Sequence, residues 1–216
     1  MKKIVTIGGG TGSFTLFRAS SSIQSELSAI VSMADDGGST GILRDELGVL
    51  PPGDVRQCLV ALSDSSETLR DLMTYRFEHG GLSGHSFGNL LLSALEKITG
   101  DFLSAVHEAA TLLNVRGEVL PVTSSDTELC VTLKNGTKLR GEHAINTDKR
   151  LGRTGIRRTF LEPKPVANPN ALQKIREADL IVIGPGNHYC SILPQSLGAR
   201  HSGSYPTLAS YSSLQL

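Results

Sequence analysis

The sequence predicts an α/β fold, a Rossmann-like three-layer sandwich with a parallel sheet and a small β-hairpin insertion. Two observations predict the sheet. A β-branched apolar run at residues 4–7 leads through a glycine-rich turn and a helical segment, residues 14–25, to a second apolar run at residues 27–31. A third apolar run, residues 180–183, ends in another glycine-rich turn. Parallel strands need such crossovers, and open sheets bind ligands beyond the carboxyl ends of their strands.

Residues 54–113 are predicted to be mostly helical, because their apolar residues recur at the spacing of a helix face. The predicted helices are residues 55–62, 69–77, 87–98 and 102–113.

A β-rich insertion is predicted over residues 117–162. Its short strand-like segments are residues 118–122, 128–133, 137–144 and 156–161. Asn135-Gly136 lies between the second and third segments and predicts a type I′ hairpin. After the insertion, Asn168 is placed as the N-cap and Pro169 in the first turn of a helix that runs to residue 178. The last parallel strand then follows over residues 179–183.

Charge and composition narrow the class of partner. The 216 residues carry 21 Lys+Arg and 21 Asp+Glu, which excludes a basic protein that holds nucleic acid mainly through its phosphates. The three cysteines contain no CxxC pair, which argues against a disulfide framework and a zinc site. The N-terminal apolar run is too short for a signal peptide or a membrane span. We therefore expect a cytoplasmic protein with no nucleic-acid partner.

We expect one Rossmann-like domain over residues 1–197 and a separate tail over residues 198–216. The tail contains five serines, one arginine and no acidic residue, and its apolar residues follow no period. Such a composition predicts disorder.

The first glycine-rich turn, residues 8–13, directly follows the first strand. Its glycines would let backbone N–H groups approach a phosphate at a helix N-terminus. The match to the dinucleotide fingerprint is incomplete, because Ser13 stands at the third glycine position and no Gly-Lys-Ser/Thr follows to make a P-loop. A tight turn without a ligand is the alternative.

Two adjacent carboxylates, Asp35 and Asp36, precede a glycine-rich stretch beyond the second strand. Carboxylate oxygens suit Mg²⁺ and loop amides suit an anion, so this segment indicates a metal or phosphate site. A solvated turn is the alternative. Asp54 stands where a helix begins, and it could be either an N-cap or a catalytic and metal-binding residue.

Residues 84–88 match the pattern G-x-S-x-G of serine hydrolases. That motif needs a buried strand immediately before it, and no strand is predicted there. We therefore favour an anion-binding segment at the start of a helix, with His85 and Asn89 as donors, over a nucleophilic Ser86. His85 could also be a loop histidine with its hydrogen bonds satisfied locally.

Glycine-rich turns at two parallel strand ends predict a crevice between them that accepts a phosphorylated or nucleotide ligand. The second turn begins at Gly184. The candidate nucleotide- or phosphate-binding residues are Gly9, Gly10, Thr11, Gly12, Gly37, Gly38, Ser39, His85, Ser86, Asn89, Gly184, Gly186 and Asn187. The candidate catalytic and metal-binding residues are Asp36 and Asp54.

Several long motifs closely resemble the bacterial gluconeogenesis factor family, which is similar in fold to the 2-phospho-L-lactate transferases. The resemblance covers residues 3–197. The motifs are IGGGTG (7–12), SMADDGGSTG (32–41), LRDELGVLPPGDVRQCLVAL (43–62), SGHSFGNLLL (83–92) and ADLIVIGPG (178–186).

The resemblance implies a UDP-sugar-binding factor that supports cell shape and growth on gluconeogenic carbon sources. By the same resemblance, the first glycine-rich turn and Asn187 would contact phosphate or nucleotide. Asp36 and Asp54 match the acidic positions expected to hold Mg²⁺ or activate an acceptor in the transferases.

The sequence departs from the family in two places. Residues 187–190 read Asn-His-Tyr-Cys, where the family often has Ser-Leu-Tyr-Thr. The resemblance stops near residue 197, whereas relatives continue, so we expect a C-terminally truncated or frameshifted chain. The missing part would leave an exposed strand edge at residues 180–183, and we expect such a chain to be less stable and to associate, for example as a homo-oligomer.

Three functions remain open from the sequence. The first is a cytoplasmic UDP-sugar-binding regulatory factor that requires no certain cofactor. The second is a Mg²⁺-dependent transferase that resembles the phospholactate enzymes and uses a nucleoside diphosphate donor, with Mg²⁺ on Asp36 and Asp54. The third is an NAD-dependent oxidoreductase, which Ser13 and the double aspartate disfavour.

Overall fold

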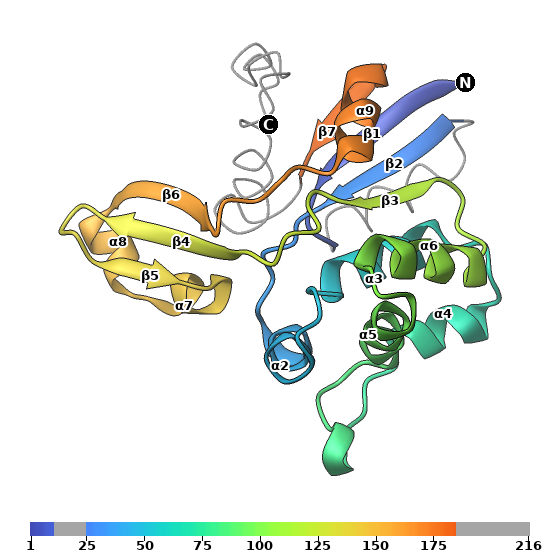
Figure 1. Cartoon of the computed structure of the whole chain (residues 1–216), viewed down its shortest axis with the longest axis horizontal. Helices are drawn as coiled ribbons and strands as arrows, with labels where there is room; N and C mark the ends of the chain where they lie inside the picture. Colours follow the sequence, from blue (N-terminus) through green and yellow to red (C-terminus); the bar gives the residue numbers. More distant parts are fainter. Residues whose placement is uncertain (11–24, 185–216) are drawn as a thin grey trace.

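The computed structural model describes residues 1–10 and 25–184, and these contain a four-stranded parallel sheet with helices on both faces (Figure 1). The strand order is β3-β2-β1-β7. The strands are β1 (Lys2–Gly8), β2 (Ser25–Val31), β3 (Glu118–Pro121) and β7 (Leu180–Ile183). The predicted α/β class and the parallel strands are confirmed.

The carboxyl ends of the four strands lie at one edge of the sheet. Gly8 is paired with Val31, Val31 with Pro121, and Ile7 with Ile183. The chain adds β2 and β3 on one side of β1 and then places β7 on the other side. The strand order therefore reverses between β1 and β7, and this is the point of an open α/β sheet where ligands bind.

Helices α3 and α6 cover one face of the sheet, and α9 covers the other (Figure 1). The helices of this part are α3 (Gly53–Leu62), α4 (Glu67–Thr74), α5 (Phe87–Thr99), α6 (Phe102–Leu112) and α9 (Pro169–Glu177). The predicted cap of α9 is confirmed, since the Asn168 side chain accepts a hydrogen bond from the Asn170 N–H at 3.0 Å. Helix α4 ends at Thr74, three residues before the predicted end.

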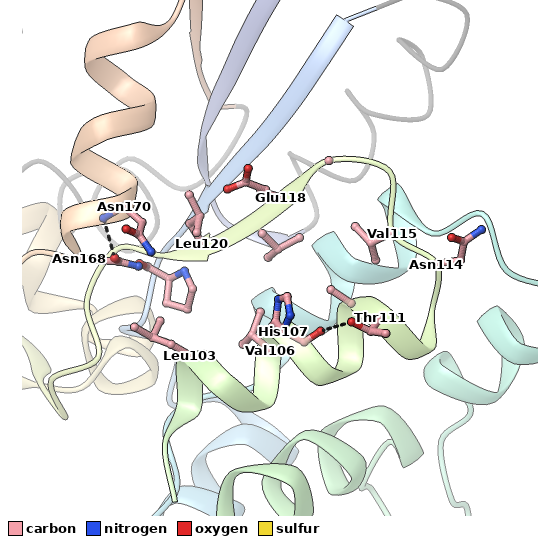
Figure 2. A pocket seen from close by; sticks show the side chains of 14 residues that line it. Leu103, Val106, His107, Thr111, Asn114, Val115, Glu118, Leu120, Asn168 and Asn170 are labelled. Carbon is pink, nitrogen blue, oxygen red and sulfur yellow. Dashed lines mark hydrogen bonds between the residues drawn. The ribbon is translucent and has the colours of Figure 1, made fainter. Parts of the chain in front are cut away.

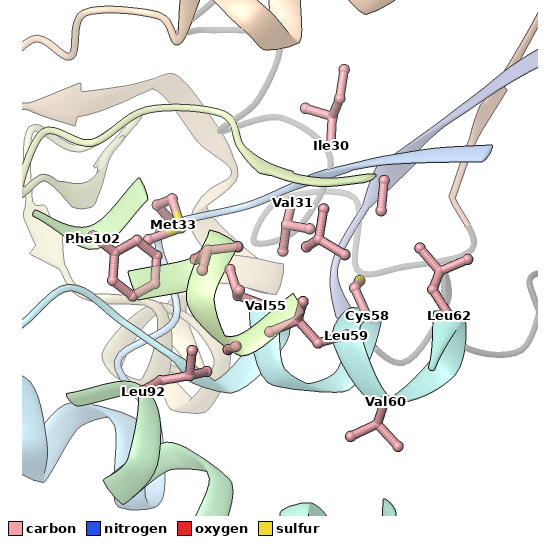
Figure 3. Packing of buried hydrophobic residues seen from close by; sticks show 14 of the residues in the cluster. Ile30, Val31, Met33, Val55, Cys58, Leu59, Val60, Leu62, Leu92 and Phe102 are labelled. Carbon is pink, nitrogen blue, oxygen red and sulfur yellow. The ribbon is translucent and has the colours of Figure 1, made fainter. Parts of the chain in front are cut away.

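The main hydrophobic core lies between α3 and the sheet (Figure 3). Val55, Cys58, Leu59 and Leu62 repeat at the spacing of one helix face, and all four are buried. They pack with buried residues of β2 that face α3, such as Val31, and with residues of α5 and α6 in one cluster. This packing fixes the first turn of α3 close to the carboxyl edge of the sheet.

A second, antiparallel sheet of order β5-β4-β6 forms the predicted hairpin insertion. Its strands are β4 (Glu128–Leu133), β5 (Lys138–Arg140) and β6 (Ile156–Glu162), and its helices are α7 (Glu142–Thr147) and α8 (Arg150–Thr154). The sheet has its own hydrophobic cluster, made by Ala34, Leu129, Val131, Leu133, Leu139, Ile145 and Leu161. Ala34 lies outside the insertion, directly after β2 of the first sheet, and packs into this cluster.

Three details of the predicted insertion are wrong. The first predicted strand, residues 118–122, is β3, which pairs in parallel with β2 and so belongs to the main sheet. The third predicted strand ends at Arg140, because Gly141 turns the chain with a φ of +85° into α7. The hairpin is not type I′, because Gly136 has a positive φ of +88° but Asn135 does not.

Helix α2 (Gly38–Leu47) was not predicted, and neither were α7 and α8 of the insertion. The first turn of α2 was interpreted as a glycine-rich loop. A Cβ atom on Gly41 would lie less than 3.0 Å from the carbonyl oxygen of Asp36. Glycine at this position therefore permits a close approach of the first turn to the preceding chain.

Among residues 1–10 and 25–184, no helix has the length and apolar character needed to cross a bilayer. The predicted helix over residues 14–25 lies almost wholly outside the described residues, and so does the predicted tail over residues 198–216.

Candidate functional site

The first glycine-rich turn lies at the end of β1 against the first turn of α3. Gly8, Gly9 and Gly10 are buried. A Cβ atom on Gly10 would lie 2.8 Å from Asp54 Cα and 2.9 Å from the Asp54 carbonyl oxygen. Both are backbone atoms, so only glycine allows this contact. The turn thus places backbone at the point where the strand order reverses.

The end of β7 reaches the same place. The Gly184 N–H donates to the Ile7 carbonyl at 2.9 Å, and Gly184 has a φ of +87°. The two predicted glycine-rich turns therefore start side by side, as expected. Thr11, Gly12, Gly186 and Asn187, also predicted to bind the ligand, lie outside the described residues.

Asp35 lies between the first turns of α2 and α3. Its Oδ1 accepts a hydrogen bond from the Gly37 N–H at 3.0 Å. Its Oδ2 would lie 2.8 Å from a Cβ atom on Gly53, the first residue of α3. Gly37 is the N-cap of α2 and Gly38 begins the helix with a φ of +48°. Asp35 therefore faces the start of α3, where Asp54 stands.

Asp54 is one of four carboxylates that form an acidic cluster with Asp35, Asp36 and Glu142. Burial, followed by the charge of Asp35, raises the pKa of Asp54 to about 6, against the opposing effects of a hydrogen bond from the Gly10 N–H and the charge of Arg56. Burial and then the charges of Asp35, Asp54 and Asp36 raise the pKa of Glu142 to about 7. The cluster thus concentrates negative charge at low solvent exposure.

The N-cap interpretation of Asp54 is wrong. Pro52 occupies the N-cap position of α3, and Asp54 lies inside the first turn. An acidic side chain is favoured there by the helix dipole. Its carboxylate accepts a hydrogen bond from the Gly10 N–H of the first glycine-rich turn.

Asp36 faces the second sheet instead of Asp54. Its Oδ1 accepts a hydrogen bond from the His143 N–H of α7 at 2.7 Å, and its Oδ2 would contact a Cβ atom on Gly141. Asp36 therefore stabilises the start of α7. Arg44 of α2 makes a second link, an ion pair with Asp126 at 2.6 Å. Together these contacts attach the second sheet to both ends of α2.

A buried polar chain connects three helices beside the acidic cluster. It consists of Arg56 on α3, Asn89 on α5, Ser39 on α2 and His85 before α5, and each is less than 9% exposed. Arg56 Nε donates to Asn89 Oδ1 at 2.9 Å, Asn89 Nδ2 donates to Ser39 Oγ at 3.2 Å, and Ser39 Oγ lies 2.9 Å from His85 Nδ1. The structure thus brings together three of the predicted binding residues.

Arg56 was missed by the sequence reasoning. A single arginine in an apolar helix is usually on the solvent side, yet Arg56 is buried, and this burial, followed by the charge of Arg76, lowers its pKa. The signal that could have indicated it is its position: Arg56 is three residues before Leu59, on the face of α3 that packs inward.

Ser86 is a helix cap. Its side chain accepts a hydrogen bond from the Asn89 N–H at 3.3 Å and is fully buried. The segment before it contains the short 3-10 helix η1 (Gly80–Leu82), so no strand precedes the G-x-S-x-G motif. This arrangement fits a structural role for Ser86 better than a nucleophilic one.

A cavity of about 480 Å³ lies apart from this site, between α6 and β3 (Figure 2). Its walls include Leu103, Val106 and His107 of α6 and Leu120 of β3, and the buried cap Asn168 stands at one end. Among the described residues that line it there is no lysine or arginine, and Glu118 is one of them. The cavity is therefore poorly suited to a phosphate, unlike the helix starts at the carboxyl edge.

No three histidine, cysteine, aspartate or glutamate side chains converge to hold a metal ion within the part of the chain that the structure describes. Asp35 and Asp54 nevertheless place two carboxylates near the starts of α2 and α3. Mg²⁺ is commonly bound by one or two carboxylates together with water and substrate phosphates. The donor set therefore fits a cation that shares its coordination with a ligand, and it does not fit a cage made by the protein alone.

Comparison with known proteins gives consistent matches over most of the chain. A sequence profile described as 2-phospho-L-lactate transferase CofD matches residues 4–198. The chain is 48% identical to the gluconeogenesis factor of Halalkalibacterium halodurans over 198 residues, 91% of this chain and 60% of that protein. It is 47% identical to the gluconeogenesis factor of Bacillus subtilis over 197 residues, 90% of this chain and 61% of that protein.

Solved structures give the same result. A crystal structure of a Bacillus halodurans protein superposes with a TM-score of 0.85 at 47% identity, covering 91% of this chain and 62% of that one. A second crystal structure from the same organism gives a TM-score of 0.86 at 46% identity, with 91% and 63% covered. The chain spans between 42% and 62% of the length of the curated relatives that it matches.

Proposed function

The chain belongs to the 2-phospho-L-lactate transferase CofD family, and from this premise we propose that it binds a nucleotide-sugar, with UDP-N-acetylglucosamine as the first candidate. In this proposal the protein acts in the cytoplasm as a gluconeogenesis factor, like the relatives that carry this name. Its binding state would regulate cell shape and growth on gluconeogenic carbon sources. A homo-oligomer is compatible with this role.

The observation that carries the proposal is the position of the glycine-rich turns. They start from β1 and β7, the two adjacent strands between which the strand order reverses. Helices α2 and α3 begin at the same edge, and their first N–H groups are natural partners for phosphate oxygens. Gly10, Gly37 and Gly38 keep the backbone near this edge free of side chains.

The ligand's polar groups would meet His85 and Ser39 of the buried polar chain. A binding factor needs no group that transfers a proton, so these residues would act only as hydrogen-bond partners of the ligand. The acidic cluster would then contact hydroxyl groups of the sugar or ribose, which carboxylates accept readily.

A second candidate is a transferase that uses a nucleoside diphosphate donor with Mg²⁺. The observation that favours it is the mutual repulsion of Asp35 and Asp54, which a cation would relieve. Asp35 and Asp54 would hold the ion, whereas Asp36 is engaged with α7. When bound, Mg²⁺ would neutralise the charge of the diphosphate. The protein's residues would orient the donor and exclude water from it.

An NAD-dependent oxidoreductase is the third candidate. It would use one carboxylate after β2 to hold a ribose, a position that Asp35 could fill. The second carboxylate at Asp54 and the serine at position 13 are not part of the dinucleotide fingerprint.

Isothermal titration calorimetry with UDP-N-acetylglucosamine, GDP and NAD, each with and without Mg²⁺, tests these candidates. Saturable binding of UDP-N-acetylglucosamine without Mg²⁺ is expected for the binding factor. Binding of GDP only with Mg²⁺ would favour the transferase, and tight binding of NAD would favour the oxidoreductase.

Variants of the carboxylates sharpen the same experiment. Asp35→Asn and Asp54→Asn are expected to weaken any Mg²⁺-dependent binding by about tenfold or more, equivalent to about 1.4 kcal/mol. Asp36→Asn should weaken it less, because Asp36 contacts α7. Asp45→Asn, an exposed position on α2, is the matched control. An equal loss of affinity in Asp36→Asn and Asp54→Asn would instead support Asp36 and Asp54 as the metal-binding pair, as the sequence predicts.

A further inference from the structure

The donors and acceptors of the buried polar chain follow one direction, because Arg56, at one end of it, can only donate hydrogen bonds. The guanidinium of Arg56 has no acceptor, so the atom of Asn89 that faces it at 2.9 Å is the carbonyl oxygen Oδ1. The amide nitrogen Nδ2 of Asn89 then points to Ser39 Oγ at 3.2 Å and donates to it. Arg56 thus fixes the orientation of the Asn89 amide.

The direction of the Asn89 hydrogen bond also determines the hydrogen bond between Ser39 and His85. Ser39 Oγ already accepts from Asn89, and its own hydroxyl proton needs an acceptor because a buried unpaired donor is costly. The other side-chain partner recorded for the hydroxyl in the described part of the chain is His85 Nδ1, at 2.9 Å. The hydroxyl therefore donates to Nδ1, which must be the unprotonated nitrogen of a neutral ring.

We infer that Arg56 and Asn89 are positioning residues that fix His85 as its Nε2–H tautomer. His85 then presents a hydrogen-bond donor and cannot act as a base through Nε2. This part of the inference deepens the proposed function and rests on it: a donor at this position suits the oxygens of a phosphorylated ligand. The site would accordingly select anionic oxygen atoms over ligand N–H groups.

Local packing explains why this arrangement needs the glycine at the end of the G-x-S-x-G motif. A Cβ atom on Gly88 would lie 2.6 Å from Arg56 Cδ and 2.5 Å from the Met73 carbonyl oxygen. Arg56 Nη1 donates to that same carbonyl at 3.4 Å. The absence of a side chain at Gly88 therefore gives the Arg56 side chain the room to reach Asn89. The Met73 carbonyl accepts a hydrogen bond from the Arg56 guanidinium and holds it in place.

The test is a measurement of the His85 tautomer in the full chain by ¹⁵N NMR of the imidazole nitrogens, at about pH 8, where an ordinary imidazole is neutral. In the wild type, Nε2 is expected in the protonated range and Nδ1 in the unprotonated range. Asn89→Asp should invert this pattern. The new carboxylate would accept from both Arg56 and the Ser39 hydroxyl, so Ser39 would have to accept from a protonated Nδ1.

Two further variants make the outcome decisive. Asn168→Asp, at a buried asparagine that caps α9, should leave the tautomer of His85 unchanged. Ser39→Ala removes the link while Arg56 and Asn89 remain, and it should give a mixture of both tautomers, so the inference stays testable if Asn89→Asp fails to fold. A wild-type ring protonated at Nδ1, or a tautomer that neither Asn89→Asp nor Ser39→Ala changes, would overturn the inference.

Ligand binding is read separately. With UDP-N-acetylglucosamine as the probe, Asn89→Asp is expected to lower the affinity by about tenfold, because His85 would present an acceptor to the ligand. If the wild type binds no UDP-N-acetylglucosamine, the proposed function fails, while the tautomer measured in the free protein still decides the roles of Arg56 and Asn89.

Discussion

The Asp54→Asn variant is expected to be more stable than the wild type at about pH 8, by roughly 2 kcal/mol. Burial and the charge of Asp35 raise the pKa of Asp54 from 3.8 to about 6. The folded chain therefore binds this proton more tightly than the unfolded chain does. Stabilisation from Asp54 is complete below about pH 4 and is lost as the pH rises through about 6. Asparagine keeps the shape and removes the charge.

The measurement is urea unfolding without divalent cations at about pH 4 and about pH 8. The free energy of unfolding of the wild type should fall between these values, and that of Asp54→Asn should fall less. Glu142→Gln should act in the same direction, with an effect that begins above about pH 4.5 and is complete above about pH 7. Asp45→Asn, exposed on α2, is the control. A variant less stable than the wild type at about pH 8 would show that the Asp54 carboxylate stabilises the fold.

Gly41→Ala is expected to lower the free energy of unfolding by about 2–3 kcal/mol. Its Cβ atom would lie less than 3.0 Å from the carbonyl oxygen of Asp36 and 3.0 Å from the carbonyl carbon, and backbone cannot move aside as a flexible side chain can. The displacement would also disturb the hydrogen bond from the His143 N–H to Asp36. The substitution thus affects the first turn of α2 and the attachment of the second sheet together.

Gly152→Ala is the matched control for this change. Gly152 lies in α8, and no heavy atom stands within 4 Å of its added Cβ. Alanine there should be neutral or stabilise the chain by about 0.5–1 kcal/mol, because it restricts the unfolded state. Denaturant midpoints of the two variants provide the comparison. Equal midpoints would mean that the backbone at Gly41 has room to shift.

The parts of the fold that depend on local pattern were predictable. Neighbouring residues alone determine several elements, namely the apolar strands β1, β2 and β7 and the helix cap at Asn168. Helix α2 was missed because glycines dominate its first turn and favour a loop locally, whereas its close approach to the Asp36 carbonyl is tertiary. The β3 segment was recognised as a strand, but its parallel pairing with β2 joins residues far apart in the sequence.

The candidate site was predictable as a location and less so in its roles. The glycine-rich turns and the residues Ser39, His85 and Asn89 were identified from small residues at strand ends and helix starts. The adjacent residues Asp35 and Asp36 are indistinguishable in sequence, since only the direction of each side chain shows which one faces Asp54. Arg56 was missed although its spacing to Leu59 places it on the inward face of α3, because the room for its buried side chain depends on Gly88, a residue of another helix.

The two hydrophobic clusters give the chain two levels of cooperativity. Among the described residues, Ala34 joins the segment after β2 to the cluster of the second sheet, and polar contacts of Asp36 and Arg44 tie that sheet to α2. Polar links of this kind resist opening less than a continuous core does. In amide hydrogen exchange, we expect Val131 to become deuterated through a partial opening that leaves Val5 protected. A ligand bound at the carboxyl edge, next to Asp36, would then slow exchange in a sheet that it does not touch.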